Sequence, residues 1–258
     1  MATPYFTSTP AGFQPAPTAS GPWSTEMLHG RLLGGLAARA LEHDVADDGW
    51  RVARLTVDLF RPAAMAPVQI STRIIRSGRR IRVADASATC EGHDVARVTG
   101  LVLLTGDEPP GRIWRPPTEP WPDPDTIADD PSDDSPDAWL VRTVEGGFGT
   151  GERSRTWTND TACLVDDEPL SPFVRAAISG DLACPMANSS DQGLYYINAD
   201  YTLSLARYPV GPWVGLEVAQ QLAADGISLA TSILVDRDGP FASSTGSSLA
   251  TTPLATDG

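Results

Sequence analysis

The sequence has little of what several large classes of protein require. Its three cysteines, Cys90, Cys163 and Cys184, are scattered and form no CxxC pair, which argues against a disulfide framework and against a structural zinc site. No apolar run approaches the roughly 20 residues that a transmembrane helix needs, so no membrane insertion is expected. Residues 1–20 lack the basic and apolar regions of a secretory signal, and we therefore expect a cytoplasmic protein.

Positive charge is scarce as well. The chain has 19 Lys and Arg against 33 Asp and Glu, which gives a formal net charge of −14. A surface of this sign repels the phosphate backbone, and no basic face with interleaved aromatic residues offsets it. Nucleic acid is therefore not an expected partner.

Residues for nucleophilic or metal-assisted catalysis are also missing. No Gly-x-Ser-x-Gly elbow occurs, and the three histidines, His29, His43 and His93, all lie in the first half of the chain. No grouping of His, Asp and Glu has the spacing of metal ligands. We expect no metal site, and we interpret Cys163 and Cys184 as small apolar core residues.

The pattern that is present is that of an α+β protein. Hydrophobic residues make up 41% of the chain and charged residues 20%, which is ordinary for a globular protein. Helices are predicted over residues 28–41 and 172–181 from their apolar periodicity, and each is followed by strands with period-two alternation. The predicted strands are 51–62, 68–75, 81–90, 95–104, 153–165, 194–207, 213–223, 227–236 and 240–251. A helix with an antiparallel meander is the simplest architecture for each half.

The two halves align with each other. Residues 55–62 (LTVDLFRP) match residues 201–209 (YTLSLARYP), and residues 95–103 match residues 241–249 at the same offset. The identities are few, and composition alone accounts for part of the match. An internal duplication is nevertheless favoured.

Two segments stand outside these units. Residues 1–22 contain five prolines and predict an extended N-terminal arm, and residues 107–152 are rich in proline and aspartate and predict a linker. The linker is expected to lie against the surface through three tryptophans, Trp114, Trp121 and Trp139.

Asp181 is the strongest candidate for chemistry. Ser171 is a candidate N-cap ahead of Pro172, so the helix that they begin carries Asp181 at its far end, before the apolar run 182–186. An ionised carboxylate in such surroundings needs hydrogen-bond partners or has a raised pKa, and it can act as a general base on water. The alternative is a solvent-exposed aspartate at a helix end.

Four segments carry a resemblance to a known family: residues 29–35 (HGRLLGG), 59–62 (LFRP), 180–181 (GD) and 196–203 (YINADYTL). Together they resemble the double-hotdog acyl-CoA thioesterases, and most closely the actinobacterial thioesterase-like branch of the type II enzymes. The resemblance implies a double hotdog, in which two antiparallel sheets are each wrapped around a central helix. Its units are an N-terminal hotdog over residues 23–106 and a C-terminal hotdog over residues 153–258.

The resemblance also implies a homodimer of lipid metabolism that hydrolyses acyl-CoA with water and uses no cofactor beyond the coenzyme A of the substrate. In the family an Asp, a Thr and a Gln activate the water. Asp181 matches the Asp, Asn198 stands at the Thr position, and Gly246 stands where the Gln is expected. Thr245 or a neighbouring serine is a candidate substitute. Loss of one positioned polar group can cost about 10²–10³ in rate, so weak or absent hydrolysis is an open alternative.

The implied substrate site lies between the units, where apolar residues hold the acyl chain and a helix N-terminus holds the oxyanion. Its candidate residues are His29, Gly30, Leu32, Gly34, Gly35, Leu36, Leu182 and Met186, with Arg79 and Arg80 for the phosphates of coenzyme A. For Gly34 and Gly35 close helix packing is the simpler interpretation. For Arg79 and Arg80 an exposed surface run is the simpler one.

Two other functions stay open. A non-catalytic acyl-CoA binding protein would keep the tunnel and lack the Gln, as Gly246 suggests. A hotdog enoyl-CoA hydratase shares the run 179–181 (SGD) and a following proline, but Ala183 and Ala187 stand where its polar residues are needed.

Overall fold

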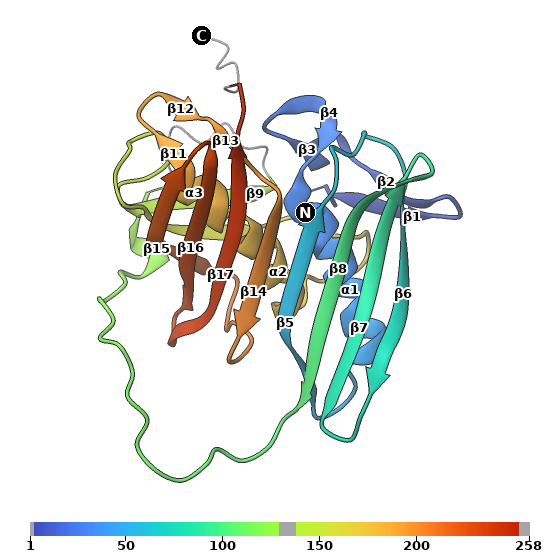
Figure 1. The fold of residues 1–258 in the computed structure, drawn as a ribbon, viewed down its shortest axis with the longest axis horizontal. Helices are drawn as coiled ribbons and strands as arrows, with labels where there is room; N and C mark the ends of the chain where they lie inside the picture. The colour runs from blue at the N-terminus through green and yellow to red at the C-terminus, as the bar shows by residue number, and fades with distance from the viewer. Residues whose placement is uncertain (1–2, 129–137, 253–258) are drawn as a thin grey trace.

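The computed structural model describes residues 3–128 and 138–252. Its main feature is one long antiparallel sheet of 13 strands (Figure 1). The strands follow the order β1-β2-β6-β7-β8-β5-β14-β17-β16-β15-β10-β9, and β13 pairs with β17. They are β1 (Phe6–Thr9), β2 (Gly12–Pro15), β5 (Trp50–Leu59), β6 (Val68–Ser77), β7 (Ile81–Cys90), β8 (His93–Leu104), β9 (Trp139–Glu145), β10 (Arg155–Asp160), β13 (Tyr196–Asn198), β14 (Asp200–Leu205), β15 (Val214–Ala224), β16 (Ile227–Asp236) and β17 (Gly239–Ala250). Two small hairpins stand apart, made of β3 (Ser20–Gly21), β4 (Ser24–Leu28), β11 (Ser189–Ser190) and β12 (Gly193–Leu194).

The middle of the sheet repeats itself. The strands β6-β7-β8-β5 of the first half meet β14-β17-β16-β15 of the second, so each half has the same order when it is followed outward from the β5–β14 junction. Thr56 lies opposite Thr202 at this junction, and Thr99 and Thr245 are their next neighbours in the register. The sequence alignment of the halves pairs these same threonines, so the predicted repeat is present in the topology.

Two-residue turns close two hairpins of the sheet. Glu91 and Gly92 join β7 to β8, and Asp225 and Gly226 join β15 to β16; all four have φ between 50° and 77°. Positive φ at both central residues is the type I′ geometry, whose twist matches that of the flanking strands. Gly at the second position adopts it without a steric cost.

The helices α1 (Gly30–Val45) and α2 (Pro172–Asp181) pack against each other on one face of the sheet (Figure 1). The predicted N-cap of α2 is confirmed, because Ser171 Oγ accepts a hydrogen bond from the Val174 N–H at 3.1 Å. A short helix, α3 (Ala183–Asn188), follows α2 after one residue. No described helix has the length and apolar character needed to cross a membrane.

Gly34 and Gly35 allow the close approach of the two halves. A Cβ at Gly34 would overlap the Tyr201 hydroxyl, and a Cβ at Gly35 would lie 2.8 Å from Ile178 Cγ1. Both contacts come from the second half of the chain. Packing therefore accounts for the two glycines, which is the simpler of the two interpretations that the sequence allowed.

The N-terminal arm is part of the sheet. The β1–β2 hairpin joins the edge of β6, and Tyr5 and Phe6 are fully buried. Their backbone N–H groups donate to the carbonyl oxygens of Cys163 and Leu164, each at 2.9 Å. The arm thus contacts both halves at once.

The linker meets the surface at fewer points than predicted. Trp121 lies edge-on to Trp157, with ring centroids 4.8 Å apart, and the Trp157 indole N–H donates to the Pro122 carbonyl at 3.1 Å. Trp114 is 79% exposed, so the prediction that it holds the linker is wrong. Trp139 belongs to β9. Part of the acidic stretch, residues 129–137, lies outside the described residues.

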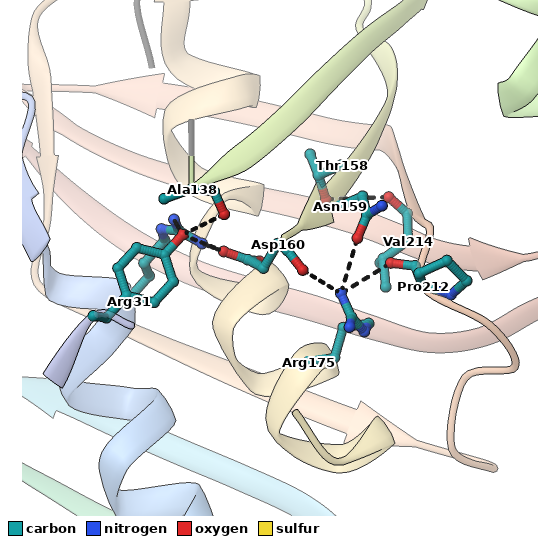
Figure 2. Close-up of polar contacts among 9 residues, drawn as sticks. Arg31, Ala138, Thr158, Asn159, Asp160, Arg175, Pro212 and Val214 are labelled. Atoms are coloured by element: carbon teal, nitrogen blue, oxygen red, sulfur yellow. Dashed lines mark hydrogen bonds and ion pairs between the residues drawn. The ribbon is translucent and has the colours of Figure 1, made fainter. Parts of the chain in front are cut away.

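A buried ion pair joins the two halves (Figure 2). Arg31, in the first turn of α1, donates from Nη1 to Asp160 Oδ1 on β10 at 2.6 Å, and both side chains are 2% exposed. The Tyr5 hydroxyl accepts from Arg31 Nη2 at 2.9 Å and donates to Asp160 Oδ1 at 2.7 Å. Burial alone would lower the pKa of Arg31, but Asp160 and Tyr5 raise it above its ordinary value. The guanidinium therefore stays charged.

A second arginine fastens α2 to the same strand. Arg175 Nη1 lies 3.2 Å from Asn159 Oδ1, 3.1 Å from the Asp160 carbonyl oxygen and 3.0 Å from the Pro212 carbonyl oxygen (Figure 2). Both helices are thus tied to β10 through arginine side chains.

Asp160→Asn is expected to destabilise the fold strongly, because it leaves the Arg31 charge buried without a counter-ion, a loss of about 3–5 kcal/mol. The matched control is Glu168→Gln. It breaks the pair between Arg39 on α1 and Glu168, whose side chains are 29% and 46% exposed, and should cost about 0–1 kcal/mol. Urea unfolding measures both free energies, and equal losses would contradict the prediction.

Candidate active site

Asp181 is buried where α2 ends and α3 begins. Its side chain is 2% exposed, and Asn198, the last residue of β13, donates from Nδ2 to Asp181 Oδ1 at 2.6 Å. The alternative of a solvent-exposed aspartate is therefore wrong. Two of the residues that the resemblance placed in a site are in contact.

The surroundings of Asp181 favour the protonated form more than water does. Burial raises its pKa from 3.8 to about 6, while the hydrogen bond from Asn198 and the charge of Arg31 act in the opposite direction. The carboxylate is therefore ionised at neutral pH and becomes protonated in mild acid. A base with a pKa just below the working pH is well matched to taking a proton from water.

The second oxygen of Asp181 is free to accept a proton. Among the described residues, no N–H or O–H donates to Asp181 Oδ2, and this oxygen is not one of the enclosed polar atoms that lack a partner. A carboxylate held through one oxygen has a fixed orientation, and its other oxygen can accept from a small molecule.

Gly246 has no room for any side chain. A Cβ there would lie 2.5 Å from the Asp200 carbonyl oxygen and would overlap the Cys184 sulfur. The backbone oxygen cannot move aside as a flexible side chain would. The family's Gln cannot be accommodated at this position, so Gly246 itself contributes no polar group.

Thr245 points away from Asp181. Its Oγ1 lies 3.0 Å from Thr231 Oγ1, and the neighbouring positions on β16, Ala230 and Ser232, are fully buried. Because side chains alternate along a strand, Thr231 and Thr245 face the opposite side of the sheet from the helices. The prediction that Thr245 substitutes for the Gln is wrong.

The apolar residues expected to line one acyl tunnel are divided between two cores. Leu32 and Leu36 pack in the cluster that includes Tyr5 and Phe6. Leu182 lies in the other cluster, with Met186 packed against it. The structure does not bring these four residues together along one channel.

The basic cluster is also remote from Asp181. Arg79 and Arg80 are exposed in the turn between β6 and β7, which lies at the opposite end of the sheet from β13 (Figure 1). His29 and Gly30 begin α1, and burial together with Arg31 lowers the pKa of His29 well below its ordinary value. Of these four residues, only His29 and Gly30 lie near Arg31, whose charge affects the pKa of Asp181.

Sequence reasoning missed a buried polar group beside this site. Asn188, Ser228 and Ser248 are at most 8% exposed, and Asn188 bonds both serines. The signal was available in part, because period-two alternation places Ser228 and Ser248 on the inward faces of their strands. Their meeting with Asn188 depends on the position of α3 over the sheet, which no local pattern records.

Other reactive features lie elsewhere or are inactive. Burial raises the pKa of Cys184 to about 12, so this cysteine is a neutral thiol and not a nucleophile. No group of three or more His, Cys, Asp or Glu within the described ranges could hold a metal ion.

A groove of about 1300 Å³ lies between residues 116–125 and the C-terminal half of the sheet, and a cavity of about 340 Å³ lies beside Arg39 and Glu168. Asp181 lines neither.

Gly246→Ala should destabilise the protein, because overpacking of a close-packed site costs about 1–3 kcal/mol. Gly106→Ala is the matched control, since nothing lies within 4 Å of its Cβ position and surface changes stay within about ±0.5 kcal/mol. Thermal and urea unfolding compare the two. If Gly246→Ala were as stable as the control, the close approach of the Asp200 carbonyl would be refuted.

Comparison with known proteins identifies related sequences and folds. The acyl-CoA thioesterase N-terminal domain model matches residues 19–104, and the acyl-CoA thioesterase C-terminal domain model matches residues 114–249. A search of curated proteins finds no significant match.

Among solved structures, a protein with a hot dog fold from Alicyclobacillus acidocaldarius has a TM-score of 0.74 at 15% identity and covers 93% of this chain and 92% of its own. The TesB protein of Mycobacterium avium subspecies paratuberculosis has a TM-score of 0.70 at 15% identity, with 90% of each chain covered. Acyl-CoA thioesterase II TesB2 from Mycobacterium marinum has a TM-score of 0.64 at 17% identity, with 86% of this chain and 90% of that chain covered. At these identities the likeness shows a shared hotdog-type α+β fold. Because the two family models together span both halves of the sheet, the chain belongs to the acyl-CoA thioesterase family.

Proposed function

We propose that the protein hydrolyses acyl-CoA thioesters by direct attack of water, with Asp181 as the general base. The observation that carries the proposal is the missing counter-ion of Asp181. Among the described residues four aspartates are buried, Asp85, Asp160, Asp181 and Asp236, and each of the others has an arginine partner. Asp181 has only the Asn198 amide. Perturbed and incompletely compensated carboxylates are typical of functional sites.

The contrast with Asp236 shows the effect of the partner. Burial acts to raise the pKa of Asp236, but Arg207 and two backbone N–H groups lower it below its ordinary value. Asp181 is equally buried and its pKa is raised to about 6. An arginine and backbone N–H groups therefore offset the cost of burial at Asp236, whereas no described arginine is paired with Asp181.

The chemistry follows from the two oxygens of Asp181. With Oδ1 held by Asn198, Oδ2 takes a proton from water as the water oxygen bonds to the thioester carbonyl carbon. The tetrahedral oxyanion then collapses, the C–S bond breaks, and the proton on Asp181 returns to the departing thiolate. The products are a fatty acid and the free thiol of coenzyme A, without a covalent enzyme intermediate.

The start of α1 is the proposed oxyanion site. Helix N-termini present unpaired N–H groups and a partial positive charge to anions, and Gly30 is the first residue of α1. Arg31 affects the pKa of both His29 and Asp181, so this helix end lies within electrostatic reach of the base. Arg79 and Arg80 are omitted from the proposal because their turn is remote.

We further propose a double hotdog, with units over residues 23–106 and 153–258 joined by residues 107–152, of which β9 is part of the sheet. The repeated strand order around the β5–β14 junction supports it. A homodimer in the cytoplasm, a place in lipid metabolism and the actinobacterial branch also remain proposals that extend the family assignment. Coenzyme A enters as part of the substrate, and no other cofactor is proposed.

A non-catalytic acyl-CoA binding protein is the second candidate. The observation that favours it is Gly246, where the structure admits no side chain in place of the family's Gln. Such a protein would bind acyl-CoA and leave the thioester intact. The buried, unpaired Asp181 argues against it, because a binder gains nothing from that charge.

Asp181→Asn is expected to abolish hydrolysis, with kcat reduced at least about 100-fold, the usual effect of a lost general base. The assay is release of free thiol from a panel of short-chain to long-chain acyl-CoAs. For the wild type, kcat/KM should rise with pH through about 6 and level off above neutrality, as the carboxylate with its raised pKa ionises. Asp94→Asn, at an exposed position near the start of β8, is the control and should retain activity.

The outcomes separate the two candidates. Hydrolysis that persists in Asp181→Asn would refute the role of this residue. If the wild type releases no thiol while acyl-CoA still raises its Tm, the protein is a binder.

Asp181→Asn should also stabilise the fold above neutrality. The folded pKa of Asp181 is about 6 against 3.8 in its ordinary state, so the folded state binds its proton more tightly, and this advantage is lost as pH rises through 6. The variant should exceed the wild type by on the order of 3 kcal/mol at pH 8, and the difference should vanish below about pH 4. Urea unfolding across this pH range measures it, and a gap independent of pH would contradict the assignment.

A further inference from the structure

A group of polar side chains lies beside Asp181 on elements that the proposed mechanism does not use. Asn188, at the end of α3, donates from Nδ2 to Ser248 Oγ on β17 at 3.4 Å. Its Oδ1 accepts from Ser228 Oγ on β16 at 2.5 Å and from Gln221 Nε2 on β15 at 3.2 Å. Asn188, Ser228 and Ser248 are 7%, 1% and 3% exposed, while Gln221 is exposed at the strand edge. We call these four residues the Asn188 cluster.

The Asn188 cluster adjoins the Asp181–Asn198 pair. Ser248 is the cross-strand partner of Asn198 in the β13–β17 pairing, and such partners lie on one face with Cβ atoms about 4.5–5.5 Å apart. Burial and the charge of Asp181 raise the pKa of the Cys184 thiol, and the Ser248 hydroxyl lowers it. Polar groups therefore continue from Asp181 to the exposed edge at Gln221.

Packing does not explain these side chains. Burial of a polar group costs free energy unless it is hydrogen-bonded, and a linked set is favourable only when its members are satisfied. Ser232, four residues after Ser228 on the same face of β16, has a buried hydroxyl with no partner among the described residues. Ser228 instead holds Asn188 in place.

We propose that Ser248, held by Asn188, binds the reacting water opposite Asp181 in place of the Gln side chain that position 246 cannot carry. The inference rests on the proposed function. Ser248 Oγ already accepts a hydrogen bond from Asn188 Nδ2, so its own O–H is oriented to donate. The neighbouring Cys184 thiol is only a weak hydrogen-bond partner, so with substrate bound the hydroxyl donates to the water oxygen. Asp181 Oδ2 takes one proton of that water, and one lone pair remains for attack.

The test compares kcat and KM of acyl-CoA hydrolysis among the wild type and three serine variants. Ser248→Ala should lower kcat about 10²–10³-fold, in the range seen for loss of one positioned donor, with KM changed less than about twofold. Ser248→Cys keeps the size of the side chain but only a weak donor, and its kcat should fall between the two. Ser232→Ala is the matched control, because it removes a buried serine hydroxyl that has no hydrogen-bond partner among the described residues. Its kcat and KM should equal those of the wild type.

The pH profile excludes a merely structural effect. Ser248→Ala should keep the rise of kcat/KM with pH that the wild type shows, because Asp181 still ionises in the same surroundings. Should Ser248→Ala fail to fold, Ser228→Ala removes the bond that orients Asn188 and should lower kcat with KM retained.

The outcomes distinguish this inference from the proposed function. Full kcat in Ser248→Ala together with an inactive Asp181→Asn overturns the role of Ser248 and leaves Asp181 as the base. The role of Ser248 is also overturned if Ser248→Ala and Ser232→Ala lose kcat equally, or if Ser248→Cys keeps the kcat of the wild type. A wild type that hydrolyses no acyl-CoA overturns both.

Discussion

The buried charge of Arg31 constrains the whole molecule. A guanidinium that is 2% exposed requires a counter-ion, and its partner, Asp160, is separated from it by 129 residues. To meet this requirement the first turn of α1 must contact β10, and the N-terminal arm must supply Tyr5, which directly precedes β1. The positive charge also reaches His29 and Asp181. The interaction that joins the halves thus helps to set the electrostatics of the candidate active site.

The repeat in the topology is broken where chemistry is proposed. At the offset that equates Thr56 with Thr202, position 181 corresponds to Gly35, whose Cβ direction is filled by Ile178. The first half therefore uses this position for packing, and the second places a carboxylate there. Helix α2 also stops at Asp181, whereas α1 is continuous from residue 30 to residue 45. A duplicated fold with one carboxylate yields one candidate site in the chain.

Local signals predicted much of the fold but only part of the site. Alternation, glycine turns and the Ser171 cap each act over a few residues, so the strands, hairpins and start of α2 could be predicted. The Asp181–Asn198 contact followed from the family resemblance. The division of the expected tunnel residues between two cores could not be foreseen, because it depends on how the helices cross the sheet. The exclusion of a side chain at Gly246 depends on the path of the chain at Asp200, a distance between strands that no sequence pattern encodes.

The buried carboxylates of this protein differ in whether an arginine pairs with them. Asp160 and Asp236 are satisfied by arginines from other elements, and the fold gains connections from both. Among the described residues, the Asp181 side chain hydrogen-bonds only to a neutral amide, and its burial raises the free energy of the folded state when it is ionised. A carboxylate that destabilises its own fold at neutral pH fits the proposed role of Asp181 as a base, because no described group donates to its second oxygen. The neighbouring Asn188 cluster fits the same reasoning, because its hydrogen bond to Ser248 orients the hydroxyl that is proposed to hold the water opposite Asp181.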